Sequence, residues 1–369
     1  MKEGRTIAAL AQELTDRKKE KHDFLADTRK LTAFSDSNRI KISGLPMPET
    51  QMQIGPRYDV DIACERALSA PALSQHALRQ VGSRLNIPAK YVDRMAEDAP
   101  DLLATNINHW FEHEPETRLV RTNNQGVRAF LSNRYRIIDN EEIAEAVLPI
   151  LAEIPDLKIE SCEVTDTKMY IKAVDPRIQG DVVGQIVQGG VCISNSEIGM
   201  GSVSVKPMAF ELRCLNGWIT DKGLSKYHIG RQSSDEERVR EIMSDETMEA
   251  DDRALMLKLR DVLKASLDQV QFDKTLNKMR DAHDVDIGDP VKAIEVIEKK
   301  GWLSKDEGKS VLKHLIEGGD LSVLGLGQAV TRASQDHTSY DRATDMEKLG
   351  GDILELPKTA WTTEMKLAA

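Results

Sequence analysis

Long apolar runs are missing from this chain. Across its 369 residues no window approaches the roughly eighteen uncharged apolar residues of a candidate membrane-spanning helix. The N-terminal sequence MKEGRTIAALAQELTDRKKEKHD also lacks the apolar centre of a signal peptide. We therefore expect a cytoplasmic protein that has no membrane partner.

Cysteine is scarce. The four cysteines lie far apart and show no C-x-x-C spacing: Cys64, Cys162, Cys192 and Cys214. Each occurs in an apolar or strand-like context, where cysteine acts as a small hydrophobic residue. This usage argues against a disulfide framework and a zinc knuckle, and we expect no cofactor and no bound metal.

Positive charge is in deficit overall, because the formal net charge is −11 at pH 7. Phosphate binding needs clustered Lys and Arg, so this deficit argues at first against a nucleic-acid partner. The distribution of positive charge is uneven, however. Residues 117–138, TRLVRTNNQGVRAFLSNRYRII, contain no acidic residue and carry five arginines: Arg118, Arg121, Arg128, Arg134 and Arg136. A second basic region, residues 202–231, includes Lys206 and Arg213. The sequence is therefore compatible with nucleic-acid binding.

The period of the apolar pattern divides the chain into regions. Residues 1–44 are expected to form an N-terminal arm, one helix followed by a loose segment, and residues 45–116 a helical region. A period of two predicts a β-rich core module over residues 117–231 that encloses one helix. Helical periodicity returns over residues 232–345, and residues 346–369 form a tail. The predicted fold class is α+β, a β-rich hairpin sheet with packed helices, flanked by helical N- and C-terminal regions.

Turn signals place the hairpins of the core module. RLVRT and VRAFL flank residues 123–126, and KIESCEV and KMYIKAV flank residues 165–167. Residues 193–218, ISNSEIGMGSVSVKPMAFELRCLNGW, read as a strand, a glycine-containing turn and a second strand. Capping-box spacings mark two later helix starts: Ser234 with Glu237, and Ser304 with Glu307.

The Asn195-Ser196-Glu197 segment has two interpretations. Asn and Ser side chains commonly bond to the amides of their own turn. Alternatively, Asn195 and Glu197 line a groove beside Lys206 and His228. The first interpretation is structural, and the second is functional.

His109-Trp-Phe-Glu112-His113 matches the H-x-x-E-H spacing of inverted zinc peptidases. On a helix the two histidines lie one turn apart and can share a Zn²⁺ ion, with Glu112 polarising a water molecule. The site needs a third ligand, and the later glutamates fall in strand-like or turn contexts. The alternative is an amphipathic helix whose aromatic residues pack inward.

Four ordered blocks carry a resemblance to a known family: QHALRQVGSRLNIPAKYVDRM, AFLSNRYRIIDN, ISNSEIGMGSVSVKPMAFELRCLNGW with a following KYH, and GQAVTRASQDHTSYDRATDMEKLGGDIL. Over about residues 70–355 the chain resembles a phage/plasmid-like protein family of unknown function found in bacteriophages and mobile elements. The resemblance implies a mobile-element protein in a bacterial host cell that is concerned with DNA. Tyr227 stands where the family leads us to expect arginine.

The order of hairpins, one helix and then a long helix is also similar to the fold of single-strand annealing proteins, which form rings or filaments and hold DNA in a basic groove. We therefore expect a non-enzymatic homo-oligomer that binds single-stranded DNA, as in annealing for phage or plasmid recombination or replication. Five arginines are expected to contact phosphates, and Tyr135 is expected to stack on a base. The five are Arg118, Arg121, Arg128, Arg134 and Arg136, with Lys206 and Arg213 flanking them in the nucleic-acid-binding surface.

Two other functions remain open. The arginines of residues 117–138 can pair with the acidic helix expected over residues 141–153 and so serve the fold. The chain is then a structural or host-interaction protein without nucleic-acid binding. The other alternative is a metal-dependent hydrolase centred on the H-x-x-E-H motif.

Overall fold

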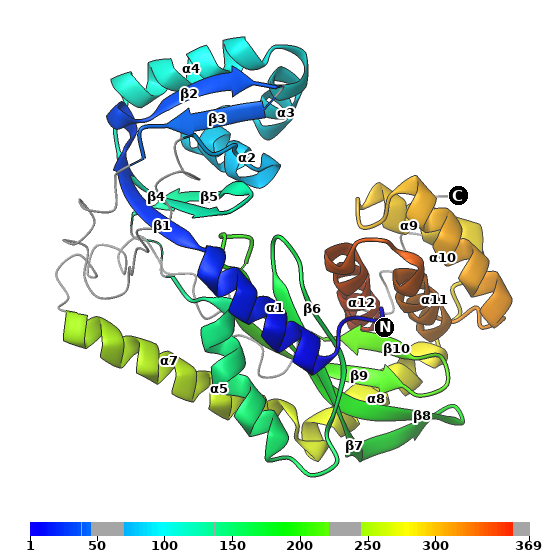
Figure 1. The fold of residues 1–369 in the computed structure, drawn as a ribbon. Helices are drawn as coiled ribbons and strands as arrows, with labels where there is room; N and C mark the ends of the chain where they lie inside the picture. The colour runs from blue at the N-terminus through cyan, green and yellow to red at the C-terminus, as the bar shows by residue number, and fades with distance from the viewer. Residues whose placement is uncertain are drawn as a thin grey trace.

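The computed structural model describes residues 1–37, 39–45, 70–133, 135, 137–201, 203–220 and 245–356. Within these residues the chain forms an α+β fold, as the sequence predicts, with three antiparallel sheets. In Figure 1 a smaller lobe, built from β1 to β5 and α2 to α4, lies above a body that holds the other strands and helices.

The upper lobe contains a three-stranded sheet in the order β1-β4-β5, together with a two-stranded hairpin and three helices. Its elements are β1 (His22–Asp27), a 3-10 helix (Thr28–Lys30), β2 (Thr32–Asp36), β3 (Arg39–Ser43), α2 (Gln75–Arg84), α3 (Ala89–Asp98), α4 (Pro100–His113), β4 (Thr117–Asn123) and β5 (Gly126–Ser132). They share one apolar core, in which the rings of Phe111 and Phe130 stack with centroids 5.8 Å apart. The hairpin expected at residues 123–126 is confirmed, with Asn123 opposite Gly126.

Residues 22–43 differ from the loose segment that the sequence predicts. After α1 (Ile7–Glu20) they form β1, β2 and β3, and β1 pairs with β4 so that Phe24 lies opposite Val120. Alternate residues of β1 are buried, but its partner is distant in sequence and no local turn joins the two strands. Local periodicity therefore could not find this pairing.

The body contains a five-stranded antiparallel sheet in the order β10-β9-β8-β7-β6. Its strands are β6 (Lys158–Val164), β7 (Met169–Val182), β8 (Gln185–Asn195), β9 (Ser204–Glu211) and β10 (Asn216–Ile219). The hairpin turns expected around residues 165–167 and within residues 193–218 are both present. Gly199, in the second of these turns, has a φ of +79°, and a Cβ there would lie 2.8 Å from Leu131 Cδ2. This turn therefore approaches the upper lobe closely.

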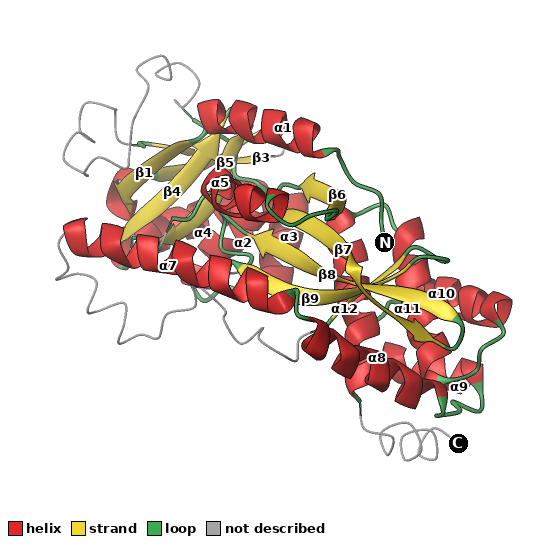
Figure 2. Ribbon diagram, turned by 90° about the horizontal axis from the view of Figure 1, so that it is seen from below, coloured by secondary structure: helices red, strands yellow, loops and turns green. Residues whose placement is uncertain are grey.

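Helices cover both faces of the five-stranded sheet. One face packs against α1, α5 (Asn140–Ala152) and α7 (Asp245–Ser266) through a shared apolar cluster (Figure 2). On the opposite face α12 (Tyr340–Glu355) packs through Tyr340, which joins Tyr170 and Cys192. The helix expected between the two predicted hairpins is present as α5, but the strands expected in one core module over residues 117–231 belong to two sheets, because β4 and β5 pair with β1.

The C-terminal region is helical, as expected. Before α12 it contains α8 (Gln269–His283), α9 (Pro290–Lys299), α10 (Lys305–Gly318) and α11 (Val323–Asp336). The capping box of Ser304 and Glu307 is present, whereas Ser234 and Glu237 lie outside the described residues. Residue 346, where we expected a tail, lies inside α12. Among the helices that the structure describes, none combines the length and apolar character needed to cross a bilayer.

A buried ion pair fixes α12 to the sheet. Lys172 Nζ of β7 lies 2.6 Å from Glu347 Oε2 of α12, and neither side chain has exposed surface. Nζ also donates to Thr344 Oγ1 at 2.9 Å and lies 4.6 Å from the centroid of the Tyr340 ring. Burial opposes the charge on Lys172, but the Glu347 carboxylate outweighs it and raises the pKa of this ammonium. The pair is thus closed and balanced in charge.

Candidate nucleic-acid interface

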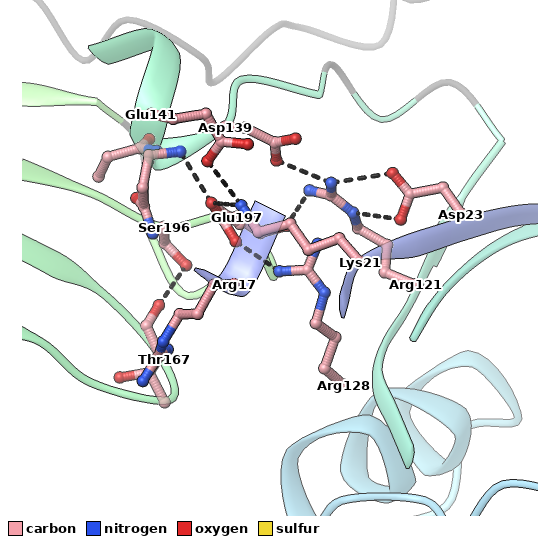
Figure 3. A network of polar contacts seen from close by, with 12 residues as sticks. Arg17, Lys21, Asp23, Arg121, Arg128, Asp139, Glu141, Thr167, Ser196 and Glu197 are labelled. Carbon is pink, nitrogen blue, oxygen red and sulfur yellow. Dashed lines mark hydrogen bonds and ion pairs between the residues drawn. The ribbon is translucent and has the colours of Figure 1, made fainter. Parts of the chain in front are cut away.

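Glu197 lies at the centre of a polar network that joins the two lobes (Figure 3). Its carboxylate accepts from Lys21 Nζ at 2.5 Å and from the backbone N–H of Asn140 at 2.8 Å, and it pairs with the guanidinium of Arg128. Lys21 follows α1, Arg128 lies on β5, and Asn140 opens α5. One carboxylate on the turn after β8 therefore holds three other elements in place.

The electrostatics of Glu197 follow from these partners. Burial favours the neutral acid, but Lys21, Arg128 and then Arg121 outweigh it and hold the pKa of the carboxyl well below its usual range. Lys21 Nζ also lies 2.7 Å from Glu141 Oε2. Glu197 is therefore a carboxylate at neutral pH.

Arg121 belongs to this network and has no exposed side-chain surface. Its guanidinium donates to both carboxylate oxygens of Asp23 at 2.8 and 2.9 Å, to Asp139 Oδ1 at 2.7 Å and to the Glu197 carbonyl at 2.8 Å. Burial opposes the charge, but Asp139 and Asp23 outweigh it and raise the pKa of Arg121 well above its usual value. Arg121 was expected on a phosphate, and its burial removes it from that role.

Arg118 and Arg128 are also paired with carboxylates. Arg118 pairs with Glu116, which Arg84 Nη2 shares at 2.5 Å, while Arg128 pairs with Glu197. Their side chains are 16% and 13% exposed, so they do not form the open row of arginines that the sequence suggests. For Arg118, Arg121 and Arg128 the alternative of internal pairing is right about burial, but their carboxylate partners lie outside residues 141–153.

The remaining predicted residues are scattered. Arg134 and Arg136 lie outside the described residues. Tyr135 is half-buried and donates its hydroxyl to the Ser196 carbonyl at 3.1 Å, and burial raises its pKa. Lys206 is half-buried on β9, and Arg213 is exposed in the turn before β10. The stacking role of Tyr135 stays a prediction.

A cleft of about 760 Å³ opens beside the Glu197 network. Its lining includes five cationic side chains, two of which belong to the network: Arg17, Lys21, Arg39, Arg128 and Lys168. Three carboxylates also line it: Glu20, Asp166 and Glu197. The cations come from α1, the residue after it, β3, β5 and the turn between β6 and β7. Folding thus gathers positive charge that is dispersed along an acidic chain.

The turn between β6 and β7 forms part of the cleft wall and is held from three sides. Arg17 Nη1 donates to the Thr165 carbonyl at 2.9 Å, and Ser196 Oγ donates to the Thr167 carbonyl at 2.8 Å. The hydroxyls of Thr165 and Thr167 donate to the Asp341 carboxylate of α12, at 3.0 and 2.6 Å. These bonds fix the backbone that carries Lys168.

The Asn195-Ser196-Glu197 segment supports the structural interpretation and only part of the functional one. Asn195 Nδ2 donates to the Ile138 carbonyl at 3.0 Å, and Asn195 does not line the cleft that Glu197 lines. Ser196 Oγ accepts from the Met200 amide at 3.0 Å, which is the expected turn bond. Glu197 lines the cleft, as the functional interpretation requires, although Lys206 does not line this cleft and His228 lies outside the described residues.

The H-x-x-E-H motif lies on an exposed face of α4. His109 and His113 stack with ring centroids 4.0 Å apart, and His113 Nδ1 lies 2.7 Å from the His109 carbonyl. Among the described residues no cluster of three metal-ligating side chains is present, so a third ligand is not found beside Glu112. The motif therefore gives no support to the hydrolase alternative.

Sequence reasoning missed Arg17, Lys21, Arg39 and Lys168. Each is a single cation in a mixed or polar context, and only tertiary pairing brings it to the cleft. Of the eight residues predicted to bind nucleic acid, Arg128 alone lines this cleft among those that the structure describes. Comparison with protein-family models, with curated proteins and with solved structures finds no match to this chain.

Proposed function

We propose that this protein binds single-stranded DNA without enzymatic activity, with the strand lying in the cleft between the two lobes. The observation that carries the proposal is the gathering of five cationic side chains in one concave site of a chain whose net charge is −11. Proteins that bind single strands combine a basic groove with polar and aromatic contacts to the bases. The resemblance to a mobile-element family and to annealing proteins agrees with this function, and ring or filament assembly is part of the proposal.

Three of the five cations of the cleft are engaged within the protein, and two are assigned here to a ligand. Arg17 pairs with Glu13 and donates to the Thr165 carbonyl. Lys21 pairs with Glu141 and Glu197, and Arg128 pairs with Glu197, so these two cations shape the base of the cleft. Arg39 is exposed and Lys168 is half-buried at its rim. We assign the phosphate contacts to these two rim residues, because exposed cations can release counterions when a phosphate binds.

Polar side chains supply the remaining contacts. Asn123 and Gln125 of the β4–β5 hairpin and Gln75 and His76 of α2 line the same cleft. Amide groups donate and accept hydrogen bonds, so they can meet bases and sugars of any sequence. A volume of about 760 Å³ lies within the range of small-ligand pockets, about 300–1,000 Å³, and so suits a short stretch of a flexible strand.

The test is a titration of fluorescent oligodeoxythymidylate by anisotropy at several salt concentrations. The variant Arg39→Ala with Lys168→Ala should bind more weakly, and the slope of log K against log salt should fall by about 0.7 for each lost phosphate contact. The matched control, Arg94→Ala with Lys313→Ala, removes one Arg and one Lys that are 77% and 68% exposed on other surfaces. Equal losses in both variants, or no binding by the wild type even at low salt, would overturn the proposal.

A further inference from the structure

A second depression, of about 550 Å³, lies next to the first cleft. Lys168 lines both, and the turn after β8 separates them, with Glu197 and Ile198 on the first side and Ser196 and Gly199 on the second. The two sites therefore meet at the Lys168 turn.

Positive charge dominates the second depression. Its cations are Lys168 of the β6–β7 turn, Lys206 of β9 and Lys348 of α12, and Asp345 is the one carboxylate among its described lining residues. All three lysines are half-buried. Three elements far apart in sequence thus bring ammonium groups to one small concave surface.

Hydroxyl groups add neutral donors to this surface. Ser194 and Ser204 line it, and their Oγ atoms are 2.8 Å apart. Tyr170 also lines it, and its hydroxyl is buried with no hydrogen-bond partner among the described residues. The Asp341 carboxylate lies near this phenol, and its oxygens accept from the hydroxyls of Thr165 and Thr167. Burial and then the Asp341 charge raise the pKa of Tyr170 well above its usual value, so the phenol keeps its proton.

The wall that α12 supplies is rigid. Thr344, Asp345 and Lys348 line the depression, and Thr344 also accepts from Lys172 Nζ, the cation that pairs with Glu347 one turn further along the helix. The first turn of the same helix holds the Lys168 turn through Asp341. Lys168 and Lys348 are therefore positioned by one helix.

We infer that the second depression is a phosphate-binding subsite that continues the path of the nucleic-acid strand beyond Lys168. The inference rests on the proposed function for the identity of the strand. Ammonium groups on flexible stems bind phosphates as point charges, and hydroxyls donate to the same oxygens. The strand then occupies two consecutive sites, with Lys168 contacting the segment between them.

Oligodeoxythymidylates of increasing length, from about 4 to about 16 nucleotides, test the path, since these are typical site sizes for single-strand-binding domains. In the wild type, affinity should rise with length until both sites are filled. In Lys206→Ala with Lys348→Ala the gain from added length should be lost, and the salt slope for the longest strand should fall by about 1.4, which is two contacts of about 0.7. Lys348→Ala alone should give about half that change.

The control pair is Lys309→Ala with Lys313→Ala, since these lysines are 78% and 68% exposed on α10. A wild-type length profile and salt slope in the Lys206 and Lys348 variant would overturn the inference and leave the proposed function standing. If the wild type binds no strand at any length, the proposed function fails. A second experiment then tests the subsite without DNA. If inorganic tripolyphosphate protects Lys206 and Lys348 from chemical acetylation, the subsite is supported, and lack of protection overturns it.

Discussion

Each of the two depressions has a cluster of buried charges beneath it, and the two clusters differ. Under the first cleft, Lys21, Arg128 and Glu197 are members of the ion network and also line the cleft. Under the second, Lys172 and Glu347 are sealed from solvent and do not line the depression. In the first site the charges that hold the fold line the same cleft as Arg39 and Lys168, whereas in the second site the two sets are separate.

The difference bears on what a ligand can change. A phosphate held by Arg39 and Lys168 in the first cleft lies beside the pairs of Glu197 with Arg128 and Lys21, and breaking a buried pair is costly. The lysines of the second depression are half-buried and lie above a closed pair, so they can adjust to a phosphate without disturbing that pair. We expect the first cleft to set the geometry of binding and the second to bind phosphate without disturbing the ion pair beneath it.

The largest effect is expected from the buried ion pair of Lys172 and Glu347. Lys172→Met leaves the Glu347 carboxylate buried without its cation, which should lower the free energy of unfolding by about 3–5 kcal/mol. Lys172→Met with Glu347→Leu removes both charges and should lie within about 1 kcal/mol of the wild type, because hydrophobic replacement of a buried pair is often neutral. Guanidinium unfolding measures both variants. Equal destabilisation of the single and double variants would contradict the view of a closed, independent pair.

Glu197→Ala should cost somewhat less, about 3 kcal/mol, at the low end of the range for broken buried pairs. The loss is smaller because Lys21 keeps Glu141 and Arg121 keeps Asp139, while Arg128 loses the carboxylate it pairs with. The same unfolding experiment applies, and Asp345→Ala serves as the control. Asp345 is an exposed carboxylate, so its removal should change stability by no more than about 0.5 kcal/mol. A loss for Glu197→Ala as small as that of the control would show that the network does not hold the lobes together.

Acid should weaken the first cluster in a predictable direction. Because the folded pKa of Glu197 is depressed, its contribution to stability is complete above the unfolded value of about 4.3 and is lost as pH falls towards the folded value. The stability difference between wild type and Glu197→Gln should therefore shrink between about pH 5 and pH 3. Glu307, whose pKa Arg342 lowers to about 2 against the effect of burial, contributes the same trend to both proteins and cancels in the difference. A difference that stays constant with pH would contradict the assignment of Glu197 as the ionised hub.

The parts of this molecule that sequence could predict are those with local signals. Turn residues and a period of two found the β4–β5 and β6–β7 hairpins, and the capping spacing at Ser304 found the start of α10. The pairing of β1 with β4 has no such signal, because the two strands are far apart in sequence and no turn connects them directly.

The candidate site follows the same division. The basic stretch led to Arg128, but it also led to Arg121, whose carboxylate partners Asp23 and Asp139 lie on other elements. Lys168 is one lysine in a polar turn, and its place at the junction of two depressions depends on α1, α12 and the turn after β8. Whether a cation is exposed or paired is decided by tertiary contacts, which composition and spacing do not contain.

The smallest effect is expected where the two sites meet. Asp341 accepts from the Thr165 and Thr167 hydroxyls in the turn before Lys168 and does not line the cleft, so we expect it to act as a positioning residue. Lys168→Ala should reduce the salt slope of single-strand binding by about 0.7, and Asp341→Ala should reduce it by a smaller amount. In the Lys168→Ala background, Asp341→Ala should change nothing further, because the group that it positions is already gone.

A readout without DNA separates positioning from simple loss of stability. Trypsin cleavage after Lys168 should be faster in Asp341→Ala than in the wild type, since the Thr165 and Thr167 hydroxyls lose their acceptor and the turn opens. Asp306→Ala, which removes a 91%-exposed carboxylate near the start of α10, should leave this cleavage unchanged. If the effects of Asp341→Ala and Lys168→Ala on single-strand binding are additive in the double variant, Asp341 does not act through Lys168. The two depressions would then not depend on α12 for their junction.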